Sequence, residues 1–242
     1  MMKLSLIIPA YNEELYLATC LQYALRELTA HAHPGEYEII VVNNASTDRT
    51  SDIAAGFSGV RVVYEPIKGL TRARQKGLES ACGDILAFID ADTRMPSGWL
   101  DKVLHAYAQR GDLVCISGPY RYFDLPGIKS VLVKFYWLAL AKPTYWCTGY
   151  MAVGGNFAAS KRALLRIGGF DTSIAFYGED TNIARRLAGE GRVQFDLDMV
   201  METSARRLKE EGFATTALRY VLNFMSEAIR NKPATSEYRD IR

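Results

Sequence analysis

The sequence predicts one α/β domain built on a doubly wound, mostly parallel central sheet with helices on both faces. Short β-rich runs alternate with helix-spaced apolar patterns as far as Tyr120, which is the order that right-handed strand–helix–strand crossovers produce. The strand-like runs are apolar almost without interruption, as expected when helices cover both faces of a sheet. With 242 residues, 49% of them apolar, the chain is long enough to bury one full core.

The elements follow in a regular order, and each is recognised by its apolar spacing. Runs such as LSLIIP and YEIIVVNN are continuous apolar strands, whereas EELYLATCLQYALREL has the three- and four-residue spacing of a helix. In chain order we predict strand 4–9, helix 13–28, strand 37–44, helix 47–57, strand 60–65, helix 70–81, strand 84–90, helix 97–110 and strand 112–120.

This rhythm stops after Tyr120. An aromatic-rich insertion occupies 124–150, and the stretch 154–171 resumes compact structure. We then predict helix 180–188, strand 192–200 and a C-terminal helix over 213–231, which together close a single domain over 1–230, and we expect a flexible tail over 231–242.

Composition excludes several classes of protein. The 29 basic and 27 acidic residues give a net charge of only +2, which is no footprint of a nucleic-acid-binding surface. The four cysteines form no CxxC pair, a pattern typical of a reduced chain. The N-terminus lacks the features of a signal peptide, and no run approaches a bilayer-spanning length. We therefore expect a cytoplasmic protein.

Polar segments follow three of the predicted strands. They are PAYNEE (9–14), NNASTD (43–48) and DADT (90–93). Ligands of open α/β sheets bind beyond the carboxyl ends of the strands. The sequence therefore predicts that these three segments converge on one site.

Asp90 and Asp92 are separated only by Ala91 at the end of a buried strand. If the backbone stays extended there, the two carboxylates point to the same side and repel each other unless a cation intervenes. A hard ion such as Mg²⁺ or Mn²⁺, with oxygen ligands, suits such a pair. The alternative is structural: Asp90 ends the strand and Asp92 begins a turn before Pro96.

Four stretches together resemble the family 2 glycosyltransferases: LSLIIPAYNEE, EIIVVNNASTDRT, DILAFIDADTRMP and GGFDTSIAFYGEDTNIARRL. The resemblance runs from about residue 3 to 207. It implies the GT-A fold, and a metal-dependent, inverting transfer of a sugar from a nucleotide-diphosphate donor to an acceptor hydroxyl. No QxxRW stretch occurs; because the processive synthases of the family carry that motif, transfer of a single sugar is favoured.

The resemblance also implies a nucleotide-binding set. Its members are Pro9, Tyr11, Glu13, Asn44, Lys68, Arg74, Asp90 and Ala91. Tyr11 and Asn44 correspond to positions at the base, while Glu13 corresponds to a position near the ribose, as does Asp90. Relatives often carry Asp where this chain has Asn43 and Asn44, but an amide can still read a base edge.

Within the same resemblance, Lys68 and Arg74 match the segment that approaches the diphosphate. Asp92 matches the metal ligand, which implies Mg²⁺ or Mn²⁺. Asp180 matches the catalytic base, with Glu179 beside it. A carboxylate within hydrogen-bond reach of the acceptor is a suitable general base. The alternative for Asp180 is an N-cap, and a helix N-terminus would lower its pKa.

Two later motifs are each open to two interpretations. Gly154 and Gly155 indicate either a tight turn or a close approach of the acceptor to the backbone. Arg206 and Arg207 either reach a phosphate of the donor or lie on a solvated helix face.

The segment 128–146 mixes Lys129, Lys134 and Lys142 with aromatic residues and contains no acid. Three interpretations stay open: contact with a membrane interface, a helix packed on the sheet and an oligomer contact. The acceptor is accordingly left open among a glycan, a lipid-linked molecule and a small molecule. Membrane contact would place the protein at the inner face of the membrane.

Competing functions differ in what should follow the first strand. A nucleotidyltransferase should carry a Gly-rich basic loop there, and a nicotinamide dehydrogenase should carry GxGxxG; PAYNEE is neither. A nucleotide-sugar-binding scaffold without turnover remains an alternative. The acidic residues at the predicted site favour the enzyme.

Overall fold

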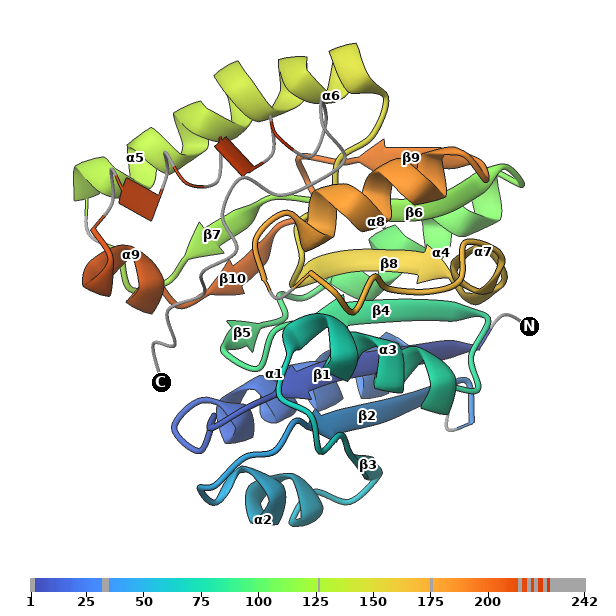
Figure 1. Cartoon of the computed structure of the whole chain (residues 1–242), viewed down its shortest axis with the longest axis vertical. Helices are drawn as coiled ribbons and strands as arrows, with labels where there is room; N and C mark the ends of the chain where they lie inside the picture. The colour runs from blue at the N-terminus through green and yellow to red at the C-terminus, as the bar shows by residue number, and fades with distance from the viewer. Residues whose placement is uncertain are drawn as a thin grey trace.

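A seven-stranded sheet forms the centre of the molecule in the computed structural model (Figure 1). The structure describes residues 3–31, 35–125, 127–174, 176–212, 215–216, 219, 222–223 and 226. The strands, in their order across the sheet, are β3 (Val60–Tyr64), β2 (Tyr37–Asn43), β1 (Leu4–Ala10), β4 (Ile85–Ile89), β8 (Asn156–Ser160), β6 (Leu113–Ser117) and β9 (Arg192–Phe195). β8 runs antiparallel to its neighbours β4 and β6, and the other pairings are parallel. The predicted α/β class and the mostly parallel sheet are confirmed.

Two apolar cores lie on the two faces of this sheet, because alternate strand residues point to opposite sides. In β4, Ile85 and Ala87 join one core, whereas Leu86 and Phe88 join the other. The first core is covered by α1 (Leu17–His31), α2 (Thr50–Ala55) and α4 (Trp99–Gln109), and the second by α3 (Leu70–Ser80), α7 (Lys161–Arg166) and α8 (Glu179–Ala188). Helices on both faces explain why the central strands β1 and β4 are almost entirely apolar.

A second, three-stranded sheet gathers segments that are distant in the sequence. It has the order β5 (Thr93–Arg94), β10 (Met201–Thr203) and β7 (Tyr120–Tyr122). β5 follows the Asp90–Asp92 segment directly, and β10 leads into the short helix α9 (Arg206–Glu210). This small sheet therefore brings the late part of the chain beside the end of β4.

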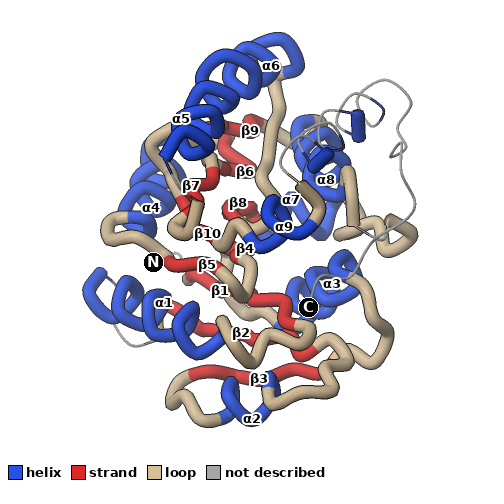
Figure 2. Tube along the Cα trace, turned by 90° about the vertical axis from the view of Figure 1, so that its left-hand side faces the viewer, coloured by secondary structure: helices blue, strands red, loops and turns tan. Residues whose placement is uncertain are grey.

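The aromatic insertion forms a helical rod along one side of the molecule, made of α5 (Gly127–Tyr136), a π-helical turn η1 (Trp137–Ala141) and α6 (Lys142–Thr148) (Figures 1 and 2). In η1 the Lys142 N–H donates to the Trp137 carbonyl, an i→i−5 bond. Pro143 follows directly and has no N–H to donate, so the irregular turn accommodates it. Across the described ranges, no helix is long and apolar enough to cross a membrane.

Several boundaries differ from the prediction for local reasons. The first helix begins at Leu17 instead of residue 13, because residues 11–16 form bends and turns. The predicted strand 192–200 ends early, at Phe195, because Asp196 accepts a hydrogen bond from the Asp198 N–H (2.9 Å) and the chain turns there; β10 begins only after the predicted range. Most of the predicted helix 213–231, and the whole of the tail 231–242, lie outside the described residues.

Candidate active site

The polar segments after β1 and β2 are tied together at the carboxyl edge of the sheet. Ala10 and Asn43 are partners at the ends of their strands, and the Asn44 N–H donates to the Ala10 carbonyl (2.8 Å). The Asn12 side chain accepts a hydrogen bond from the Thr47 N–H (2.8 Å). The segment after β4 lies at the same edge, because β1 and β4 run parallel. The three segments thus share one edge of the sheet.

Asp90 and Asp92 line the same cavity of about 100 Å³, together with Pro9, Glu13 and Ala91. The backbone between them is a turn and not an extended strand: the Thr93 N–H donates to the Asp90 carbonyl (3.2 Å). The expected extended geometry is therefore wrong, although both carboxylates still face one cavity. The turn that the alternative interpretation placed at Asp92 is present, and it begins at Asp90.

Each of these carboxylates is paired with an arginine from elsewhere in the chain. Asp90 Oδ1 lies 3.2 Å from Arg74 Nη2, and its other oxygen accepts a hydrogen bond from the Tyr120 hydroxyl (2.9 Å). Asp92 Oδ2 lies 3.1 Å from Arg206 Nε. The repulsion that two adjacent carboxylates would create is thus offset by two guanidinium groups.

Arg74 connects the Asp90 turn with the start of α8. Its side chain is 1% exposed and forms ion pairs with both Asp90 and Glu179. Burial alone would lower the pKa of this guanidinium, but its two carboxylate partners outweigh burial and raise it. A buried arginine without such partners would carry an uncompensated charge. Arg74, which was expected to approach the diphosphate, is therefore fixed by two other site residues.

Glu179 is the first residue of α8, and Gly178 precedes it as the N-cap with a left-handed φ of 83°. Asp180 is therefore not the N-cap, and the structural alternative for it is wrong. Asp180 Oδ1 accepts a hydrogen bond from the Thr181 N–H (2.8 Å). The first turn of α8 thus carries two adjacent acids at the site.

Burial dominates the electrostatics of these two acids. Burial raises the pKa of Glu179 to about 7, although Arg74 opposes the shift. Burial also raises the pKa of Asp180 above its ordinary value, and the hydrogen bond from Thr181 opposes this shift. The lowering that we expected from a helix N-terminus is therefore wrong in sign for Asp180.

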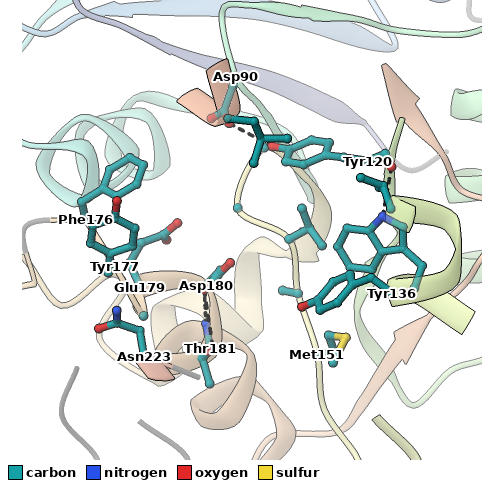
Figure 3. Close-up of a pocket in the computed structure, with 18 of the residues that line it drawn as sticks. Asp90, Tyr120, Tyr136, Met151, Phe176, Tyr177, Glu179, Asp180, Thr181 and Asn223 are labelled. Carbon is teal, nitrogen blue, oxygen red and sulfur yellow. Dashed lines mark hydrogen bonds between the residues drawn. The ribbon is translucent and has the colours of Figure 1, made fainter. Parts of the chain in front are cut away.

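Asp180 faces a larger cavity of about 400 Å³ (Figure 3). Asp90 and Tyr120 lie across this cavity from Asp180, and Glu179 lies beside it. The wall from the helical rod is apolar and includes Leu132, Phe135, Tyr136, Trp137 and Leu140. Burial and the nearby charge of Asp180 raise the pKa of Tyr136 to about 12.

Gly154 and Gly155 pass between the acidic groups of the site. A Cβ on Gly155 would lie 2.2 Å from both Asp90 Oδ2 and the Tyr120 hydroxyl, and one on Gly154 would lie 2.5 Å from Glu179 Oε1. The two residues form a turn before β8 and line the larger cavity. Here the turn and the close approach coexist, but the groups that approach the backbone belong to the protein itself.

Tyr11 and Lys68 come together at the outer part of the same edge. Lys68 Nζ lies 3.9 Å from the centre of the Tyr11 ring. The Asn44 side chain holds the loop before and after Lys68 by two hydrogen bonds: its Nδ2 donates to the Ile67 carbonyl (2.8 Å), and its Oδ1 accepts from the Gly69 N–H (2.8 Å). Asn44 is only 3% exposed, so its amide holds the loop that carries Lys68.

Arg206 is the residue that the predicted set lacks. Its guanidinium pairs with Asp92 and with Glu13, which is 2% exposed. The pair of arginines after the last strand was the available signal, but no local pattern distinguishes a site residue from a solvated helix there. Two tyrosines of the site are also missing from the predicted set. Tyr120 could have been predicted, because it follows a strand of the sheet. Nothing in the sequence distinguishes Tyr136 from the other aromatic residues of the insertion.

Comparison with known proteins identifies the family to which the sequence is similar. Residues 5–168 match the model of glycosyl transferase family 2. The chain is 35% identical over 114 residues to the putative glycosyltransferase EpsH of Bacillus subtilis. The aligned region covers 46% of this chain and 32% of that protein. The chain spans from 28% to 47% of the length of the first curated relatives.

Two solved structures share the fold. The mannosyltransferase PcManGT of Pyrobaculum calidifontis, in complex with GDP-Man and Mn²⁺, has a TM-score of 0.75 at 21% identity over 97% of this chain and 66% of its own. The glucosyl-3-phosphoglycerate synthase of Mycobacterium tuberculosis, in complex with Mn²⁺ and UDP-glucose, has a TM-score of 0.65 at 24% identity, over 97% of this chain and 81% of its own. At these identities the likeness establishes the GT-A fold alone.

Proposed function

This chain belongs to glycosyl transferase family 2, and we propose that it transfers a single sugar, with inversion, from a nucleotide-diphosphate sugar to an acceptor hydroxyl. One observation carries the proposal. The cavity at Asp92 and the cavity at Asp180 share Asp90 and Tyr120 in their walls. A donor bound in the cavity at Asp92 would therefore extend its sugar toward the cavity at Asp180, where the Asp180 carboxylate could accept a proton from the acceptor.

The donor side is proposed to run from Tyr11 to the Asp90 turn. The Tyr11 ring and the Lys68 ammonium offer a stacking surface and a positive charge, which suit a base and a phosphate. Pro9, Glu13 and Ala91 line the inner cavity and would bound the ribose and diphosphate. Asn44 is proposed to act through the 65–69 loop that it holds, not by touching the base.

The residues present fit a divalent cation, Mg²⁺ or Mn²⁺. Asp90 and Asp92 face one cavity, and Mg²⁺ is commonly held by one or two carboxylates together with substrate phosphates. In the ranges that the structure covers, no group of three or more His, Cys, Asp or Glu side chains is placed so that it could hold a metal ion by itself, so the diphosphate would have to complete the ligand set. Asp92 would hold the ion, which when bound offsets the charge that develops on the leaving diphosphate.

Asp180 is proposed as the general base. It lines the larger cavity, and a base must lie within hydrogen-bond reach of the proton that it removes. Its raised pKa makes it a stronger base than an exposed aspartate. Glu179 is proposed as a positioning residue, because its pairing holds Arg74 and through it Asp90.

Hydrolysis of GDP-mannose and UDP-glucose, the donors bound in the two solved structures, tests the proposal with water in place of the acceptor. We expect Mn²⁺-dependent release of nucleoside diphosphate, lost in Asp92→Ala. Asp112→Ala is the matched control, since Asp112 is exposed at the start of β6, the opposite edge of the sheet. Saturable donor binding without any turnover would instead support the scaffold, and NMR of the released sugar would show inversion or its absence.

A further inference from the structure

The outer face of the helical rod carries a long apolar stripe. Ile128 (77% exposed), Val131 (63%), Phe135 (64%) and Leu138 (59%) follow one another at three- and four-residue spacing, so they share one side of a helix. Trp146 (68% exposed) continues the stripe into α6. Soluble proteins rarely expose a contiguous apolar patch of this kind without a binding partner.

The opposite face of the rod is already used. Ala141 is buried against Met151, Val153 and Phe195, and the Trp137 indole N–H donates to the Tyr120 carbonyl (3.1 Å). Packing on the body of the protein therefore accounts for the inner aromatic residues. It leaves the outer stripe unexplained.

Charge defines the kind of partner that fits the stripe. At about 100° per residue, Lys134 falls roughly 40° beyond Leu138 at one edge of the stripe, and Lys129 roughly 100° beyond Ile128 on the other side; both side chains are exposed. No acidic residue occurs between Asp124 and Asp171. Lysines that flank an apolar helix face place their ammonium groups at the level of anionic headgroups while the apolar side chains enter the acyl boundary.

The stripe is continuous with the proposed acceptor cavity. Leu132, Phe135 and Leu140 are 48%, 64% and 54% exposed, respectively, and each also lines the cavity that contains Asp180. A partner bound to the stripe would thus lie next to the opening of this cavity. A bilayer surface fits this arrangement better than a folded protein partner, because the flanking charges are of one sign.

We propose that the outer face of the rod, residues 128–146, binds the surface of an anionic lipid bilayer and lies parallel to it. The proposal goes beyond sugar transfer and does not depend on it: docking requires only the exposed side chains of the rod. If the proposed function also holds, the docked protein offers Asp180 to hydroxyl groups at the level of the lipid headgroups.

Flotation of the purified chain, residues 1–242, with vesicles tests the proposal. We expect the chain to float with vesicles that contain phosphatidylglycerol, and to stay at the bottom of the gradient with phosphatidylcholine alone. Val131→Ser combined with Leu138→Ser should reduce binding by roughly tenfold or more, because two apolar anchors are removed. Lys129→Gln and Lys134→Gln should each reduce it about fivefold, and added salt should do the same.

Leu165→Ser is the matched control, since Leu165 is equally exposed (57%) but belongs to α7 on the body of the protein; it should float like the wild type. Failure of the wild type to float would overturn the proposal, as would flotation that the rod variants leave unchanged. A rod variant that converts a dimer into a monomer, with no flotation in either form, would assign the stripe to a second copy of the chain. Donor hydrolysis without vesicles reports separately on the proposed function, because Val131 and Leu138 line neither cavity.

Discussion

Arg206 Nε lies 3.1 Å from Asp92 Oδ2, which ties the start of α9 to the turn after β4. The same guanidinium pairs with Glu13 after β1, and burial lowers its pKa less than these carboxylates raise it. A positive charge of the chain therefore neutralises the carboxylate to which we assign the metal. A divalent cation that binds Asp92 must share or displace this partner.

Replacing Arg206 should therefore change metal binding before any chemistry occurs. We expect Arg206→Gln to bind Mn²⁺ alone severalfold more tightly than the wild type, because the competing cation is gone. Asp92→Asn should abolish this binding. Electron paramagnetic resonance of free Mn²⁺ measures both without substrate.

Lys209→Gln is the control for this experiment. Lys209 lies on the same helix but pairs with Asp124 (2.7 Å) and does not line the cavity at Asp92, so its removal should leave Mn²⁺ affinity unchanged. Weaker Mn²⁺ binding in Arg206→Gln would show that the guanidinium supports the metal site and does not compete for it.

Arg74 should contribute more to stability than to recognition of the donor. Its removal leaves Asp90 and Glu179 without their shared partner, and breaking a buried ion pair from one side costs about 3–5 kcal/mol. We expect Arg74→Met to lose stability of this order in urea denaturation. Combining it with Glu179→Gln should restore part of the loss, because one stranded carboxylate becomes neutral; simple additivity of the two changes would contradict the shared network.

The sheet and the donor edge could be predicted because their signals are local. Continuous apolar runs identify strands such as 84–90, and the polar residues that follow a strand must lie at its carboxyl end. The same reasoning predicts that Asp90 and Asp92 lie at the site, and the two residues line one cavity in the structure.

The electrostatic partners could not be predicted, because each pairing joins residues that are distant in the sequence. Nothing near Asp92 indicates Arg206, which reaches it through the small sheet of β5, β10 and β7. The sign of the pKa shift of Asp180 was wrong for the same reason. A helix N-terminus can be recognised in the sequence, whereas the burial that raises the pKa of Asp180 depends on which distant segments enclose the same cavity.

Gly155 should tolerate no side chain. A Cβ there would overlap Asp90 Oδ2 and the Tyr120 hydroxyl at 2.2 Å, so Gly155→Ala must push the Asp90 carboxylate aside. We expect a loss of about 1–3 kcal/mol in thermal or urea unfolding, the usual cost of overpacking, together with weaker donor binding. Gly111→Ala is the control, since an added Cβ meets nothing within 4 Å there; equal effects of the two changes would contradict the clash.

Glu179 should make stability depend on pH. Its pKa is raised from 4.5 to about 7, so between these values the folded protein holds a proton that the unfolded chain has released. The free energy of unfolding should therefore fall as the pH rises from 4.5 to about 7, by about 3 kcal/mol at most from this group. Urea denaturation across this window should show the slope in the wild type and lose it in Glu179→Gln; parallel curves for the two proteins would contradict the shift.

Asp180 should set the acid limb of the reaction. A general base works only as the carboxylate, and burial raises the pKa of Asp180 above the ordinary value of 3.8, so donor turnover should decline at a higher pH than an exposed aspartate would allow. Asp180→Asn should lower kcat by about 10²- to 10⁴-fold and leave donor affinity unchanged, because Asp180 lies in the larger cavity and not in the one at Asp92. The comparison is Asp171→Asn, an exposed carboxylate on the preceding loop whose pKa is lowered by Ser173. The measurement is a pH profile of donor hydrolysis. Full turnover in Asp180→Asn, or an acid limb that the substitution leaves unchanged, would show that another residue is the general base.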